Sequence, residues 1–111
     1  MIELEKIVNL KMCYKDKNKC SSYEYINDSK KITYDENIQR IKFTLIAVDF
    51  DKEKYDVILI IENETVKVKT DLFDDASKLY RFELFKNKNG YILTRDFPED
   101  KEVIYIHIEL D

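Results

Sequence analysis

Few residues of this chain could carry out catalysis. His107 is the only histidine, and a nucleophilic serine or cysteine needs such a base held against it. It stands between Tyr105 and Glu109 in an alternating run that is typical of a strand, so we expect it on a strand's outer face. The single glycine also excludes a glycine-rich phosphate loop. We predict that the protein is not an enzyme and uses no cofactor.

An acidic segment is the candidate metal site. Asp49, Asp51 and Asp56 lie between two apolar runs, and carboxylates gathered at one end of a sheet can surround Ca²⁺, which takes about 6 to 8 oxygen ligands. The segment from Val48 to Asp56 is similar to the third calcium loop of C2 domains, a family of β-sandwiches. The resemblance covers about nine of the 111 residues. It implies a Ca²⁺ site with further carboxylates from residues 71–75, and the alternative is a solvated turn.

A lysine-rich segment with interleaved tyrosines runs from Lys11 to Lys31. Lysines beside stacking aromatic rings are what single-stranded nucleic acid binds. The segment contains no arginine, residues 96–111 are acidic, and the net charge of the chain is −4. This charge balance disfavours binding along the phosphate backbone of a nucleic acid. Nucleic acid is therefore the third candidate ligand, and a solvated loop is the alternative.

Three tyrosines are the candidate partner-binding residues. Tyr23, Tyr25 and Tyr34 lie where no hydrophobic periodicity requires burial, and tyrosine is favoured in interfaces because it covers apolar area while keeping a hydroxyl group. By elimination we predict a protein-binding module of the inhibitor, immunity or phage counter-defence type. It would bind another protein through these tyrosines and an acidic surface. The alternative is that the rings pack against the ends of the fold. The partner and the oligomeric state stay open.

The two cysteines and the first residues bear on the cellular compartment. Cys13 and Cys20 could form a disulfide in an oxidising compartment. The start of the chain lacks the basic beginning and apolar middle of a secretory signal, and no apolar run is long enough to span a membrane. We therefore expect a cytoplasmic protein with two free thiols and no membrane contact. The abundance of Lys, Asn, Ile, Glu and Tyr is typical of a low-GC bacterium or its phage.

The clearest structural element is a hairpin in the middle of the chain. Asn63-Glu64 reads as a two-residue turn, and its register pairs Ile61 with Val66 and Leu59 with Val68. Apolar residues thus face each other on one side. On the second face the same register places lysines opposite isoleucines: Lys67 opposite Ile60 and Lys69 opposite Ile58.

A second hairpin turns at residues 87–90, where Gly90 is expected to adopt a positive φ. Pairing Lys86 with Tyr91 gives chemically sensible partners on both faces. The predicted pairs are Leu84 with Leu93, Tyr80 with Phe97, Arg81 with Asp96, Glu83 with Thr94, and Phe85 with Ile92.

The remaining segments complete the predicted fold. We expect a first strand over 2–14 with a bulge near Lys6-Ile7, a polar loop over 15–22, an irregular strand within 23–33, and a final strand from Val103 to Leu110. Residues 1–111 then form a single all-β domain, an antiparallel β-sandwich of about seven or eight strands. The alternatives are a small β-barrel, or an α+β fold with one short helix near 71–78.

Overall fold

The structure is a computed structural model that describes residues 6–16, 19–26, 30–48, 52–73, 75–99 and 101–111. These residues contain no α-helix, and no helix among them is long and apolar enough to cross a membrane. They form nine strands: β1 (Ile7–Asp16), β2 (Lys19–Tyr25), β3 (Lys31–Asp35), β4 (Ile38–Ala47), β5 (Lys54–Glu62), β6 (Thr65–Thr70), β7 (Tyr80–Lys86), β8 (Gly90–Phe97) and β9 (Glu102–Leu110).

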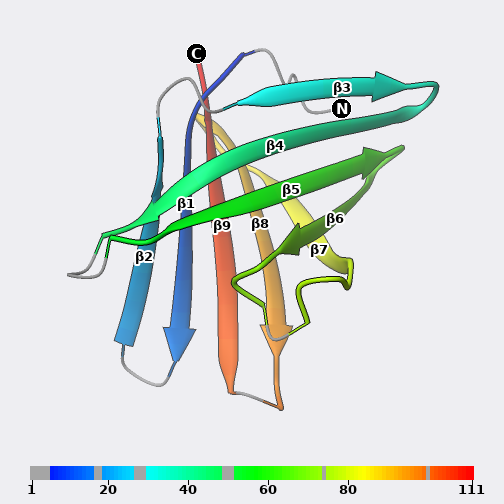
Figure 1. Ribbon diagram of the computed structural model, residues 1–111. Coiled ribbons are helices and arrows are strands. Elements are labelled where there is room, and N and C mark those ends of the chain that lie inside the picture. Colours follow the sequence, from blue (N-terminus) through cyan, green and yellow to red (C-terminus); the bar gives the residue numbers. More distant parts are fainter. Residues whose placement is uncertain (1–5, 17–18, 27–29, 49–51, 74, 100) are drawn as a thin grey trace.

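The strands form a closed antiparallel barrel. Their order in the sheet is β2-β1-β9-β8-β7-β6-β5-β4-β3, and β2 also pairs with β4, so that eight strands close into a ring. Strand β3 lies outside this ring and pairs with the first half of β4 (Figure 1). The all-β prediction is confirmed in its barrel form. A sandwich leaves two separate sheets, whereas the pairing of β2 with β4 joins the two ends of this one sheet.

The barrel interior is filled by the side chains of alternate residues along each strand. In β5, Val57, Leu59 and Ile61 are buried while their neighbours are partly or fully exposed. The same alternation runs through β4, where Phe43 is the largest fully buried side chain of the protein. An eight-stranded barrel is just wide enough for such side chains to fill it. The interior is therefore a packed core.

Both predicted hairpins are present. In the β5–β6 hairpin Ile61 pairs with Val66 and Leu59 with Val68, as predicted, and Asn63 has the positive φ, 55°, that the turn requires. In the β7–β8 hairpin the four pairs nearest the turn are also as predicted. The predicted pairs of Arg81 with Asp96 and Tyr80 with Phe97 are not in the ladder, because β7 pairs with β8 only from Glu83 to Lys86 and diverges from it before that.

The reason for the glycine at position 90 differs from the predicted one. No described glycine has a positive φ. Instead, a Cβ on Gly90 would overlap the main-chain carbonyl oxygen of Ile108 in β9. Gly90 is therefore required by the close approach of two backbones.

The N-terminal third departs most from the prediction. The register of β1 against β9 shifts between Ile7 and Asn9, which confirms a bulge close to the predicted place and turns Ile7 into the core. Residues 15–22, predicted to be a polar loop, belong largely to the β1–β2 hairpin. The expected free thiols are also wrong, because Cys13 is disulfide-bonded. The only other cysteine, Cys20, has a side chain outside the described part.

The connection between β6 and β7 closes one end of the barrel without a helix. Asp75 accepts hydrogen bonds from the hydroxyl (2.6 Å) and the main-chain N–H (3.0 Å) of Ser77, which form a local turn and lower the pKa of the Asp75 carboxyl. Phe73, only 7% exposed, packs its ring 5.1 Å from that of Tyr80 and 5.6 Å from that of Phe97. Phe73 therefore packs into the hydrophobic core against the rings of Tyr80 and Phe97.

Thr70 anchors this connection. It is 2% exposed, and its hydroxyl donates to the carbonyl of Asp56 at 2.7 Å and accepts from the N–H of Leu72 at 3.3 Å. We expect Thr70→Val to lower the free energy of unfolding by about 1–3 kcal/mol, because it removes both bonds while keeping the shape. Urea denaturation measures this. Thr94→Val on the outer face of β8 is the matched control, and equal losses in both variants would contradict the anchoring role.

Candidate functional site

The outer faces of β3 to β7 carry two neighbouring rows of cations. Cross-strand register assigns to one row Thr33, Arg40, Ile60, Lys67 and Arg81. It assigns to the adjacent row Lys31, Lys42, Ile58 and Lys69. Each row thus holds three cations and no carboxylate. We call these six cations and the two isoleucines the cationic face.

Most of the charge on the cationic face is unneutralised. Arg40 lies 3.9 Å from Asp35, and Lys42 lies 3.5 Å from Asp56. Lys67, Lys69 and Arg81 make no ion pair with any described residue. Acidic residues lie in the two rows that flank the cationic face. Glu62 lies in the row beside that of Arg40, and Asp56 lies in the row beside that of Lys42. A chain with a net charge of −4 therefore presents a locally positive surface.

A shallow groove crosses this face. It has a volume of about 540 Å³, and its cationic lining comes from Arg40, Lys67 and Arg81. Ile60, which is half-buried, and Leu79, which is 42% exposed, supply apolar surface between these charges. The lining also includes the carboxylate of Glu62, so the groove carries three cations and one carboxylate. Apolar surface beside an excess of positive charge suits a ligand that combines aliphatic groups with negative charge.

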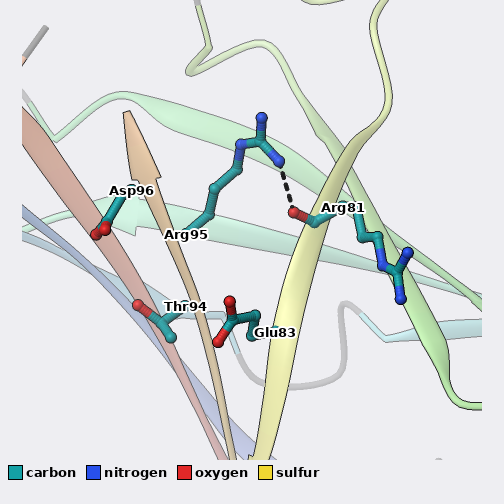
Figure 2. A pocket seen from close by; sticks show the side chains of 5 residues that line it. All are labelled: Arg81, Glu83, Thr94, Arg95 and Asp96. Atoms are coloured by element: carbon teal, nitrogen blue, oxygen red, sulfur yellow. Dashed lines mark hydrogen bonds between the residues drawn. The ribbon is translucent and has the colours of Figure 1, made fainter. Parts of the chain in front are cut away.

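A second surface pocket of about 300 Å³ lies at the seam where β7 leaves β8. Figure 2 shows the side chain of Arg95 crossing from β8 to the main chain of β7, where it donates to the carbonyl of Arg81 at 2.8 Å. The same guanidinium lies 5.2 Å from the ring centre of Tyr80 and 5.1 Å from that of Phe97. Arg95 therefore bridges a gap in the ladder, and we assign it a structural role. The lining also includes Glu83 and Asp96, so this pocket has balanced charge.

The three tyrosines predicted to bind a partner are not brought together. Tyr23 is half-buried, packs against the core, and has its ring 5.6 Å from that of Tyr55. Tyr34, on β3, is 53% exposed. Tyr23 pairs with Ala47 and Tyr34 with Gln39, eight residues apart on β4, which is roughly 26 Å along a strand. Tyr25 pairs with Leu45 in the main chain, and its side chain lies outside the described part.

Two of the three predicted calcium ligands, Asp49 and Asp51, lie outside the described residues. The third, Asp56, stands on the outer face of β5. Its carboxylate accepts from the hydroxyl of Thr44 at 3.1 Å and pairs with Lys42. Within the described ranges no three acidic, histidine or cysteine residues are grouped so that they could hold a metal. The calcium site stays a prediction.

The other sequence candidates are also dispersed. The segment from Lys11 to Lys31 is divided among β1, β2 and the start of β3, and parts of it are not described. Nucleic-acid binding through it stays a prediction. His107 is exposed on β9 beside the ring of Tyr105, at 6.4 Å between ring centres, as expected for the outer face of a strand.

Comparison with protein-family models, curated proteins and solved structures found no match to this chain. The site is therefore argued from its own geometry.

Sequence reasoning did not identify the cationic face. Part of the signal was present, because the predicted β5–β6 register already set Lys67 beside Ile60 and Lys69 beside Ile58. Arg40 and Arg81 join them through β4 and β7, whose registers against β5 and β6 were not predicted.

Proposed function

We propose that the protein is a non-enzymatic binding module that recognises an acidic segment of another protein through its cationic face. The observation that carries this proposal is the row in which the half-buried Ile60 lies between Arg40 and Lys67, with Arg81 next to Lys67. Carboxylates of a partner would neutralise the cations, and an aliphatic side chain between them would cover Ile60 and Leu79.

The apolar part of the face favours a protein ligand over a nucleic acid. Sites for single-stranded nucleic acid use aromatic side chains as stacking platforms for the bases. The cationic face contains the aliphatic Ile58 and Ile60 and no aromatic residue. The partner we propose is therefore an acidic peptide segment with aliphatic residues.

Charge reversal on the face tests the proposal. The wild-type protein, immobilised, is used to capture proteins from nuclease-treated host lysate, and each captured protein is quantified by mass spectrometry against the Lys67→Glu/Arg81→Glu variant. We expect retention of an acidic protein to fall at least about tenfold, because like charges placed at an interface cost several kcal/mol. The matched control is Lys11→Glu/Lys86→Glu, which makes the same charge change at exposed positions on other parts of the barrel.

The result that supports the proposal is loss of the acidic protein with the first variant and retention within about twofold with the control. Equal retention by all three proteins would overturn it. Capture that occurs only from lysate left untreated with nuclease would assign the face to nucleic acid instead.

The cytoplasmic location predicted from the sequence remains a prediction. The disulfide at Cys13 argues against it, because disulfides are rare in cytosolic proteins.

A further inference from the structure

Strand β3 is the one described strand with a single neighbour in the sheet. It pairs with β4 over five residues, and no described strand pairs with its other edge. Four of its five residues are exposed. An open edge presents unpaired main-chain N–H and C=O groups, and such groups are a template for pairing with another strand.

The sequence of this edge is complementary to itself. When two copies of Lys31–Asp35 run antiparallel about a two-fold axis at Thr33, Lys31 lies opposite Asp35 of the second copy, and Ile32 lies opposite Tyr34 of the second copy. The two-fold axis makes each of these pairs twice. Opposite charges and aromatic residues facing β-branched ones are both favourable cross-strand pairs.

We propose that two copies of the protein form a dimer by antiparallel pairing of their β3 edges. The faces of the strand agree with this register. Lys31, Thr33 and Asp35 alternate with Ile32 and Tyr34, so the charged pairs lie on the outer face of the extended sheet and the apolar pairs lie on the other. The ring of Tyr34, 53% exposed in one copy, would be covered in part by Ile32 of the second.

The charges at the edge are available for these pairs. Lys31 makes no ion pair with any described residue. Asp35 lies 3.9 Å from Arg40, and the two side chains are 67% and 44% exposed, so this contact is a long surface pair. Surface pairs of this kind contribute little to stability. Asp35 can therefore accept the lysine of a second copy at small cost.

The dimer does not rest on the proposed function, although it uses Lys31 of the cationic face. Since β3 is continuous with the cationic face, pairing at its edge places two such faces on one sheet, related by the two-fold axis. A partner with two acidic segments would then bind by both at once, with a gain in avidity.

Sedimentation velocity at increasing protein concentration tests the dimer directly. Because the interface is only five residues long on each side, we expect a weak dimer that forms between about 10 μM and 1 mM. Lys31→Asp places two aspartates opposite each other, and Asp35→Lys places two lysines opposite each other. Each variant alone is expected to raise the dimer dissociation constant at least about tenfold.

Mixing the two variants is the decisive step. In a heterodimer both edge positions again carry opposite charges, so the mixture should associate as the wild type does while each variant alone stays monomeric. Circular dichroism of the separate variants checks that both are folded. A wild type that is monomeric at every concentration, single variants that dimerise as the wild type does, or folded variants that stay monomeric when mixed would each overturn the proposal.

Discussion

Replacing Phe43 with alanine is expected to lower the free energy of unfolding by about 3–5 kcal/mol, because it removes the largest fully buried side chain and leaves a cavity in the middle of the barrel. Domains of this kind are stable by only about 5–15 kcal/mol, so the variant should lose a large part of its total stability. Urea or guanidinium unfolding followed by far-UV circular dichroism measures this as a shift of the midpoint.

Phe85→Ala is the matched control for this variant. The ring of Phe85 is 52% exposed on β7, and its removal should change stability by about 1 kcal/mol or less. The same side chain is thus deleted once from inside the barrel and once from its outer face. Equal losses in the two variants would contradict the assignment of alternate residues to the interior.

The second large effect is expected at Gly90. Gly90→Ala should destabilise the protein by about 3 kcal/mol or more, because the new Cβ overlaps a carbonyl oxygen of the β9 main chain and the β8–β9 ladder must move. Thermal unfolding measures the loss. Asn89→Ala, exposed in the same turn, is the control and should cost less than about 1 kcal/mol.

Gly90→Asn separates the two explanations for this glycine. Asparagine tolerates a positive φ, so it would be accepted if backbone conformation were the reason for the glycine. It carries a Cβ, so it should be as damaging as alanine if the close approach to Ile108 is the reason. A stable Gly90→Asn variant would contradict the packing explanation.

Local features of the fold were predictable because local residues decide them. The β5–β6 hairpin follows from the Asn63-Glu64 turn and the alternation on both sides of it, and its register is as predicted. The four pairs of the β7–β8 hairpin next to its turn were predictable for the same reason.

The closure of the barrel was not predictable from local pattern. Strand β2 (Lys19–Tyr25) is mostly polar, so no periodicity marks it, and its pairing with β4 joins residues 20 to 24 positions apart. Sandwich and barrel share the same hairpins and differ only in such long-range pairs. The packing of Phe73 was missed because Leu72 and Phe73 are the only large apolar residues of a mostly charged and polar segment, residues 71–78.

The candidate site was harder to predict than the fold. The tyrosines were chosen for their residue type, and the structure separates Tyr23 from Tyr34 along β4. The cationic face is built from single residues of five strands, and each lysine or arginine there reads in the sequence as an ordinary solvent-facing strand residue. Its charge appears only when neighbouring strands are aligned.

The central claim, that the cationic face binds carboxylates of a protein partner, is tested most directly by zero-length carbodiimide cross-linking of the captured complex. This reaction joins an amine to a carboxylate only when the two are in contact, and mass spectrometry identifies the linked residues. We expect Lys67 and Lys69 to be linked to aspartate or glutamate residues of one acidic segment of the partner. Cross-links that avoid both lysines and gather at Lys11, Lys86 or Lys88 would contradict the claim.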